Sequence, residues 1–486
     1  MLKYSRAPVL RLKHQGFPYQ VDAVKALKDL DYAAVFHEQG LGKTKIAIDI
    51  AIDWLSKKTV DSVLFVTKKG LIANWRQELA SHSFLSPLVL DQDSRSNFLA
   101  LNSPAAVYLT HYEVCRGDEK QIKLFLKTRR VGVICDEAHK LKNPEAALTK
   151  TFLTLSPLFH RRLILTGTPI ANRPYDIWSL IRFLDHGKSI PEDFSTFKQQ
   201  LELDSDLASD NERGREFRNA LAALPDRIRG FSVRENKKTA GLILPDKEFH
   251  PIFACFEAEQ KKLYEKFREG LKVEILKDGQ TIIDDADDVL KRLLRLVQIA
   301  SNPKIVDNAY AVSPGKFEVL QKLIAQIPPD EKIILWSTFT DNVDWLHAAL
   351  ASHGTVKVHG KLPMQTRQVS IESFKTDPKV RIFIATPASS KEGLTLTVAN
   401  HCIFYDRGFS LDDYLQAQDR IHRISQSRPC HIYNIMVEDT IDEWVDELIE
   451  TKGLAAKLGQ GDINVDRFLA TASNRFNEIL HEILNN

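Results

Sequence analysis

Short runs of β-branched and apolar residues alternate with helical patterns along the first third of the chain. The runs are apolar throughout, which is typical of strands buried on both faces. Between them, Ile46, Ile50 and Trp54 recur at helical spacing. Strand followed by helix, repeated, predicts a parallel sheet with helices on both sides. The predicted strands cover residues 33–36, 63–67, 107–110, 131–136 and 163–166.

The same alternation returns in the last third of the chain. From about residue 176 to residue 307, strand runs disappear and charged amphipathic segments such as 211–224 and 289–299 take over. We therefore predict two α/β lobes with helical insertions between them. The strands predicted for the second lobe cover residues 333–337, 356–359, 381–386, 402–406 and 431–436.

Composition limits the classes of protein to which the chain can belong. Hydrophobic residues make up 43% and charged residues 27% of the 486 residues, which is typical of a globular protein. Lys and Arg number 66 against 64 Asp and Glu, so nucleic-acid contacts would depend on local basic patches. The 5 cysteines lie far apart without a CxxC pair, which argues against a disulfide framework or a zinc knuckle. No window resembles a signal peptide or a membrane span, so we expect a soluble intracellular protein.

A glycine-rich loop follows the first predicted strand and reads His37-Glu38-Gln39-Gly40-Leu41-Gly42-Lys43-Thr44. Glycines let backbone amides approach phosphate oxygens, and a helix N-terminus offers unpaired N–H groups to an anion. Lys43 would reach the β and γ phosphates of ATP, and Thr44 would bind Mg²⁺. His37 stands where the strict pattern has Gly, and Gly-Lys-Thr by itself also occurs in ordinary helix-opening turns. The prediction is an ATP and Mg²⁺ site that uses Gly40, Leu41, Gly42, Lys43 and Thr44.

An acidic pair, Asp136 and Glu137, follows the strand predicted at residues 131–136. Open α/β sheets bind ligands at the carboxyl ends of their strands, so both carboxylates would lie at the ligand-binding edge. Asp136 would hold the magnesium shell, and Glu137 would orient or deprotonate the attacking water. An acidic pair after a strand is usually a solvated loop, but the preceding phosphate loop favours a shared site.

Two arginines of the second lobe, Arg420 and Arg423, are three residues apart. On a helix they would share a face and could point into a cleft between the lobes, where guanidinium groups would neutralise charge developing on the γ-phosphoryl. The alternative is a surface helix whose charges form local pairs. The phosphate loop favours the first interpretation, in which hydrolysis requires closure of the lobes because Lys43 belongs to the other lobe.

The order of these motifs resembles the superfamily two helicase-like ATPases, and in detail the Swi/Snf-type double-stranded DNA translocases. In the first lobe, Phe17-Pro18-Tyr19-Gln20 resembles an adenine-reading Q motif, and residues 74–78 resemble the next motif. The segment from Asp136 to Pro144 is similar to the extended acidic box of that family, and residues 165–172 are similar to its coupling motif. In the second lobe the resemblance rests on residues 332–340, 392–394 and, above all, 416–426.

The resemblance implies an α/β fold with two RecA-like parallel-sheet lobes and helical insertions between them. It implies an ATP-binding lobe at residues 1–185, insertions and a linker at 186–312, a second lobe with arginine fingers at 313–450 and a helical tail at 451–486. Further expected site residues are Gln20 and Gly393 for the nucleotide, His139, Thr166 and Thr168 for coupling, and Lys68, Lys69, Thr110, Lys391 and Thr395 for nucleic acid.

The function implied by the resemblance is ATP-driven movement along double-stranded DNA, or remodelling of protein–DNA complexes, without strand separation. Contacts would be mainly to the phosphate backbone, and a partner protein would supply specificity. The expected location is the bacterial cytoplasm, in a bacterial or phage system, or the nucleus if the source is eukaryotic.

Four residues depart from the family pattern and put the outer edge of the nucleotide site and the DNA path in doubt: His37, Lys391, Thr395 and Ser425. Two other functions stay open. One is a strand-separating helicase of the DEAH-box type acting on RNA or single-stranded DNA, although Asp419 and His422 stand where that class usually has Gly. The other is a nucleotide-gated scaffold without turnover, against which the retained Lys43 and Glu137 argue.

Overall fold

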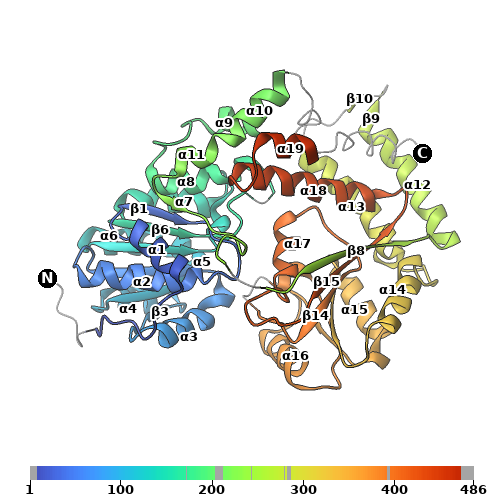
Figure 1. Ribbon diagram of the computed structural model, residues 1–486, viewed down its shortest axis with the longest axis horizontal. Helices are drawn as coiled ribbons and strands as arrows, with labels where there is room; N and C mark the ends of the chain where they lie inside the picture. The colour runs from blue at the N-terminus through green and yellow to red at the C-terminus, as the bar shows by residue number, and fades with distance from the viewer. Residues whose placement is uncertain are drawn as a thin grey trace. The chain divides into compact units, whose positions relative to one another are not determined.

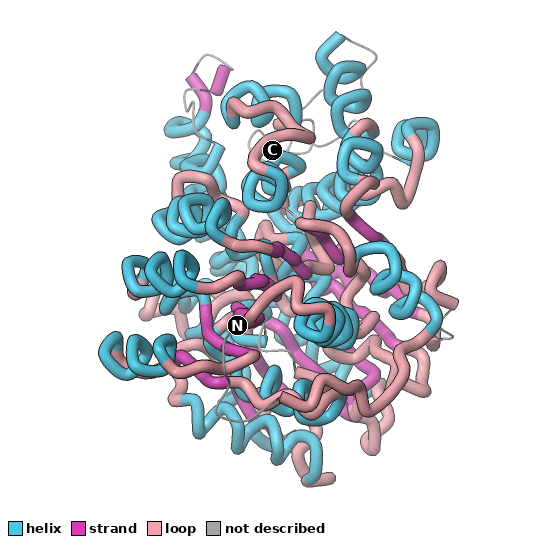
Figure 2. Tube along the Cα trace, turned by 90° about the vertical axis from the view of Figure 1, so that its left-hand side faces the viewer, coloured by secondary structure: helices cyan, strands magenta, loops and turns pink. Residues whose placement is uncertain are grey.

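The computed structural model describes residues 8–170, 172–202, 212–241, 244–277, 280–281, 286–390 and 394–471. The chain divides into two compact units. The first comprises Met1–Leu242 with Ala455–Ala470, and the second comprises Ile243–Leu454 with Thr471–Asn486. Each unit contains its own parallel sheet, flanked by helices (Figures 1 and 2).

The sheet of the first unit has seven strands in the order β3-β4-β2-β5-β6-β1-β7, and all neighbouring strands are parallel. Their carboxyl ends therefore lie at one edge. The strands are β1 (Tyr32–Val35), β2 (Ser62–Thr67), β3 (Leu88–Leu90), β4 (Val107–His111), β5 (Val131–Asp136), β6 (Arg161–Leu165) and β7 (Ser232–Val233).

The predicted apolar stripe of Ile46, Ile50 and Trp54 is buried in α2, the helix that follows the glycine-rich loop. The indole N–H of Trp54 donates to the carbonyl of Lys28 at 2.9 Å, which fixes α2 against the end of α1. The helices of this unit are α1 (Pro18–Leu27), α2 (Lys43–Ser56), α3 (Ile72–His82), α4 (Ser94–Asn102), α5 (Tyr112–Gly117), α6 (Glu119–Thr128), α7 (Ala147–Leu155), α8 (Ile177–Asp185), α9 (Phe194–Leu201), α10 (Glu212–Ala222) and α11 (Leu224–Ile228).

The sheet of the second unit has six parallel strands in the order β12-β13-β11-β14-β15-β8. They are β8 (Lys247–Ala254), β11 (Lys332–Trp336), β12 (Thr355–Val358), β13 (Ile382–Ala385), β14 (Ala399–Phe404) and β15 (Cys430–Val437). The helices are α12 (Ala258–Ile275), α13 (Ala286–Ser301), α14 (Gly315–Gln326), α15 (Thr340–Ala349), α16 (Met364–Thr376), α17 (Leu411–Gln418) and most of α18 (Ile441–Gly459). The chain then returns to the first unit, to which nearly all of α19 (Val465–Thr471) belongs. β9 (Leu276–Lys277) and β10 (Gln280–Thr281) pair antiparallel in a separate two-stranded sheet.

The predicted fold class, two RecA-like parallel-sheet lobes with helices, is confirmed. Every strand predicted from the sequence is present, with its ends within a few residues. The expectation that residues 176–307 contain no strands is wrong, because β7, β8, β9 and β10 lie there. Pro251 interrupts the strand pattern of β8 and is tolerated because β8 forms the edge of its sheet. Among the helices that the structure describes, none combines the length and apolar character that a membrane crossing requires.

A buried ion pair joins two helices of the second unit. Lys316 in α14 places its ammonium 2.7 Å from the Asp442 carboxylate in α18, and their side chains are 0% and 6% exposed. The Lys316 ammonium also donates to the carbonyl of Tyr405, and the Asp442 carboxylate accepts a bond from the backbone N–H of Val437. Removing one partner of such a pair leaves a buried charge without compensation.

We expect Lys316→Met to lower the free energy of unfolding by about 3–5 kcal/mol, because Asp442 would lose its counter-charge. The matched control is Lys322→Met in the same helix, whose pair with Glu318 is exposed. Urea denaturation should show a large loss for Lys316→Met and almost none for the control. Equal losses of unfolding free energy in the two variants would show that the buried pair stabilises the protein no more than the exposed pair does.

Candidate nucleotide-binding site

The loops that carry the predicted motifs follow four adjacent strands of the first sheet. The glycine-rich loop follows β1, the coupling motif follows β6, the acidic pair ends β5, and Lys68 follows β2. These strands are neighbours in the order β2-β5-β6-β1, and all run in the same direction. The topology therefore brings the four motifs to one edge of the sheet, as open α/β sheets do for their ligands.

The glycine-rich loop turns sharply before α2. Gly40 and Gly42 have φ angles of 86° and 65°, a backbone conformation that residues with a Cβ rarely adopt. Gly42 is the N-cap of α2, so Lys43 and Thr44 occupy the first turn of the helix. The Lys43 ammonium donates to the carbonyls of His37 and Glu38 at 3.0 and 3.2 Å. The loop is thus folded around this ammonium.

Gln20 contacts the glycine-rich loop from α1. Its amide nitrogen donates to the carbonyl of Leu41 at 3.2 Å, and its amide oxygen accepts from the backbone N–H of Phe17 at 2.9 Å. The Tyr19 hydroxyl donates to the same Leu41 carbonyl. The predicted Q motif therefore lies against the predicted phosphate loop, while adenine reading by Gln20 stays a prediction.

Asp136 is held by hydrogen bonds to both carboxylate oxygens. The indole N–H of Trp75 in α3 donates to one oxygen at 2.8 Å, and the backbone N–H of Glu137 donates to the other at 2.9 Å. Burial, followed by repulsion from Glu137, raises the pKa of Asp136 to about 6. Sequence reasoning recognised the motif at residues 74–78 but gave Trp75 no role. The position of a tryptophan within that motif was the available signal.

Glu137 takes the left-handed backbone conformation, with a φ of 51°. One of its carboxylate oxygens lies 3.1 Å from His139 Nδ1, and the Lys68 ammonium lies 3.0 Å from His139 Nε2. An ammonium can only donate, so His139 Nε2 accepts from Lys68, while Nδ1 faces the Glu137 carboxylate. Burial raises the pKa of Glu137, but the His139 bond and the charges of Lys68 and Lys43 outweigh burial and lower it. The structure therefore holds Glu137 as a carboxylate.

The coupling motif packs directly on the glycine-rich loop. Thr166 and Thr168 are buried, and the Thr168 N–H donates to the Thr166 hydroxyl at 3.3 Å. Between them, a Cβ added to Gly167 would lie 2.7 Å from Gln39 Cγ and 3.2 Å from Lys43 Nζ. The motif therefore requires glycine at this position for close packing, and Ala171 at its end lies outside the described residues.

His37, which departs from the family pattern, connects the glycine-rich loop to the segment after β7. The buried imidazole accepts from the backbone N–H of Glu235 at 3.1 Å. Burial, followed by the positive charges of Lys43 and Arg234, lowers the pKa of His37 to about 4. The Arg234 guanidinium donates to the carbonyl of Phe36 and pairs with Asp462 at 2.6 Å. These partners of the loop were not predicted, because their contacts span a long sequence separation.

The two predicted arginines lie in the second unit, and the expectation that they share a helix is wrong. α17 ends at Gln418, and Arg420 and Arg423 occupy the turns that follow. The Arg423 side chain donates back to the carbonyl of Asp419, whose carboxylate binds Lys247 at 3.2 Å. These tertiary contacts favour turns over continuation of the helix.

Both arginines bind the same short segment of the second unit. Arg420 donates to the carbonyl of Leu394 at 3.1 Å, and Arg423 donates to the Thr395 hydroxyl at 2.9 Å. Next to this segment, the Ser425 and Thr397 hydroxyls lie 2.9 Å apart. Two departures from the family pattern, Thr395 and Ser425, thus make side-chain hydrogen bonds in the turns around the arginines.

The candidate nucleic-acid residues differ in their surroundings. Lys69 is exposed in the short helix Lys69–Leu71, whereas Lys68 is bound to His139. Thr110 is fully buried in β4 and donates its hydroxyl to the carbonyl of Leu90 at 2.7 Å, which argues against a contact with DNA. Lys391 and Gly393 lie outside the described residues.

Comparison with known proteins identifies the family. Residues 19–305 match the SNF2-related domain, and residues 315–425 match the helicase conserved C-terminal domain. The first match alone covers more than half of the chain. The chain belongs to the SNF2-related family. The predicted resemblance is therefore confirmed, and this SNF2-related chain is a helicase-like core of an ATP-dependent hydrolase family.

Its relatives include longer proteins. The chromodomain-helicase-DNA-binding protein 1-like of Danio rerio is 28% identical, and the match covers 88% of this chain and 42% of the relative. The DNA repair and recombination protein RAD54B of Homo sapiens is 26% identical, with 85% of this chain and 51% of the relative covered. This SNF2-related chain spans about half the length of the curated relatives it matches. The SWI2/SNF2 ATPase core of Sulfolobus solfataricus in complex with dsDNA is 24% identical, with 98% of each chain covered and a TM-score of 0.43.

We expect Gly167→Ala to weaken ATP binding by about 10-fold or more, because the added methyl group would displace Gln39 or Lys43. Gly230→Ala is the matched control, since a Cβ at Gly230 would have no neighbour within 4 Å. Titration with a fluorescent ATP analogue measures both dissociation constants. Unchanged affinity in Gly167→Ala would show that the glycine-rich loop does not bind the phosphates.

Proposed function

We propose that this SNF2-related chain hydrolyses ATP to move along double-stranded DNA without separating its strands. The observation that carries the proposal is the state of Glu137. It is a half-buried carboxylate beside Asp136, next to His139, which Lys68 binds, and at the same sheet edge as Lys43. This is the arrangement that hydrolysis of a phosphoanhydride by an activated water requires.

In the proposed reaction the glycine-rich loop binds the triphosphate. Backbone N–H groups at the start of α2 face the phosphates, and Lys43 exchanges its bonds to loop carbonyls for bonds to the β and γ phosphates. The hydroxyl of Thr44 and the carboxylate of Asp136 fit Mg²⁺, which prefers oxygen ligands. Bound Mg²⁺ would neutralise phosphate charge, while Glu137 orients the attacking water and accepts its proton.

We further propose that Arg420 and Arg423 stabilise charge on the γ-phosphoryl group. Arg423 is held by Thr395 and by the Asp419 carbonyl, which orients its guanidinium. Because the arginines and Lys43 belong to different units, this role requires the units to come together around ATP. Cycles of ATP binding and hydrolysis would then drive movement.

Several observations favour double-stranded DNA over the substrates of strand-separating helicases. Asp419 binds Lys247, and His422 lies 2.8 Å from the carbonyl of Pro245, so these two side chains attach the turns after α17 to the start of β8. Strand-separating helicases usually have Gly at both positions. The names of the human and zebrafish relatives also connect them with DNA. Exposed Lys69 is our leading candidate for a phosphate contact, and specificity would come from a partner protein in the cytoplasm.

The deciding experiment measures ATP hydrolysis by the purified chain with duplex DNA, single-stranded DNA, RNA or no nucleic acid. Stimulation by duplex DNA, displacement of a third strand from a triplex and absence of duplex unwinding are expected. Stimulation by RNA alone, or unwinding of the duplex, would favour the strand-separating alternative. ATP binding without turnover under every condition would favour a nucleotide-gated scaffold.

Lys43→Ala should abolish ATP turnover, because the phosphates lose their ammonium partner, and it should leave duplex binding largely intact. Lys57→Ala at the exposed end of α2 is the control and should retain turnover. Steady-state hydrolysis and filter binding to duplex DNA measure the two properties. Full activity in Lys43→Ala would show that the phosphate site is assigned wrongly.

Arg423→Ala should retain ATP affinity and lose hydrolysis by about 10³-fold or more, because an arginine finger acts mainly in the transition state. Arg428→Ala is the control on the same segment, since Arg428 binds the carbonyl of Val398. ATP affinity and single-turnover rates separate the two effects. A loss of affinity with a normal rate per bound ATP would rule out the proposed role.

A further inference from the structure

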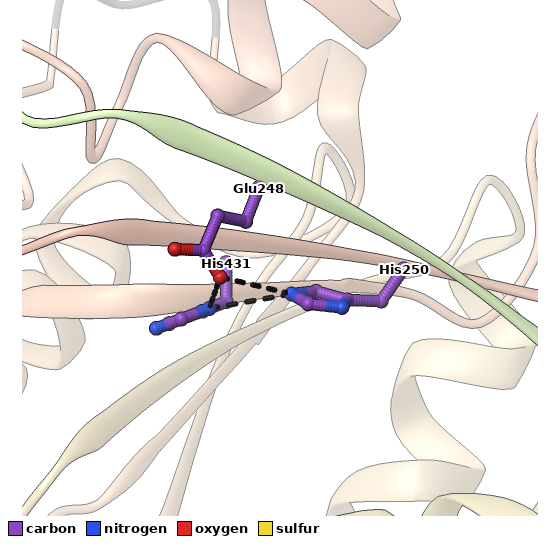
Figure 3. A group of neighbouring side chains, drawn as sticks. All are labelled: Glu248, His250 and His431. Carbon is purple, nitrogen blue, oxygen red and sulfur yellow. Dashed lines mark hydrogen bonds and ion pairs between the residues drawn. The ribbon is translucent and has the colours of Figure 1, made fainter.

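A group of three potential metal ligands lies in the second unit at the amino end of two paired strands. Glu248 and His250 come from the edge strand β8, and His431 comes from its neighbour β15 (Figure 3). Residues i and i+2 of a strand share a face, and His431 is the register partner of Glu248. The three side chains therefore converge on one face of the sheet. None of the three side chains belongs to the predicted nucleotide motifs.

The distances within the group fit a single ion. His431 Nδ1 lies 3.3 Å from His250 Nε2 and 3.2 Å from a carboxylate oxygen of Glu248, and that oxygen lies 3.7 Å from His250 Nε2. Two ligand atoms at zinc bond lengths in a tetrahedron are about 3.3 Å apart. The three atoms thus already stand close to the corners of one face of such a tetrahedron. A fourth position, on the open side, would belong to water.

Neighbouring aromatic rings restrict the two imidazoles. His250 stacks on Tyr433, with ring centroids 4.9 Å apart, and His431 stacks on His401 at 5.0 Å. His401 itself is bound to Glu331 and to the Tyr433 hydroxyl, so its nitrogens are already used. The rings of His250 and His431 are therefore preoriented, which lowers the entropy cost of binding an ion.

The group is also accessible from solvent. The side chains of Glu248, His250 and His431 are 49%, 36% and 25% exposed. An ion could therefore enter without opening the sheet. Two imidazoles and one carboxylate are a ligand set for Zn²⁺, and imidazole also suits Ni²⁺ and Cu²⁺ better than it suits Mg²⁺ or Ca²⁺.

We propose that Glu248, His250 and His431 bind one divalent transition-metal ion of the Zn²⁺ class in tetrahedral geometry. The bound ion joins the edge strand β8 to β15 at their first residues. Lys247, the residue before Glu248, binds the Asp419 carboxylate in the turns after α17. The ion therefore stabilises the start of β8, on which this contact depends.

The test uses the full chain without a polyhistidine tag, freed of metal by a chelator and titrated with Zn²⁺ in competition with a chromophoric chelator. One equivalent should bind with a dissociation constant below about 1 μM. Glu248→Gln, His250→Ala and His431→Ala should each weaken binding by about 100-fold or more. Zn²⁺ should raise the melting temperature of the unaltered chain and not of these variants. With Co²⁺, strong visible absorption typical of tetrahedral coordination is expected.

Two controls separate the site from nonspecific binding. His353→Ala removes a histidine elsewhere in the second unit, and Cys255→Ser removes the exposed thiol, so both should retain one tight equivalent. Glu248→Gln changes an exposed side chain without changing its shape, so its effect cannot be attributed to misfolding. Absence of a saturable equivalent, or tight binding that persists in Glu248→Gln and His250→Ala, would overturn the proposal. Neither result bears on ATP hydrolysis, which is measured separately.

Discussion

The parallel direction of the strands is the constraint on which the rest of the structure depends. In each of the two large sheets, every strand pair is parallel, so all carboxyl ends meet at one edge and all amino ends at the other. In the first unit this brings the loops after β1, β2, β5 and β6 together, although their residues are far apart in the sequence. In the second unit the same rule brings the first residues of β8 and β15 together. One topological rule thus positions both the candidate nucleotide site and the candidate metal site.

Within the first site, burial raises the pKa of both carboxylates, and the groups around each carboxylate decide the final direction of its shift. Asp136 receives neutral donors from Trp75 and from the backbone, so its pKa stays raised. The Glu137 carboxylate lies beside the His139 ring and near the positive charge of Lys68, and its pKa is lowered. Neighbouring residues of one type therefore acquire different proton affinities from their surroundings. The lowered pKa keeps Glu137 ionised, which suits a carboxylate that orients the attacking water.

The sequence predicts those features that depend on local pattern. The strands of both lobes, α2 and the order of the motif loops follow from apolar runs and glycine positions, and the structure contains them. Features that depend on distant contacts were missed or wrong. β8 contains Pro251 and is a strand because β15 pairs with it, and Arg420 and Arg423 leave the helix because Asp419 is bound from β8. The group at Glu248 could not be predicted, since His250 and His431 are 181 residues apart.

The residues that depart from the family pattern are likewise explained by contacts that the local sequence pattern does not show. A motif comparison marks His37, Thr395 and Ser425 as exceptions, and it gives no reason for them. In the structure each of these side chains has a partner: His37 accepts from Glu235, Thr395 accepts from Arg423, and Ser425 lies beside Thr397. The glycine that the family pattern has in place of His37 and Ser425 could not make such a side-chain bond. The exceptions therefore attach the loops to neighbouring segments of their own unit, and the loops keep their place at the sheet edge without the family residue.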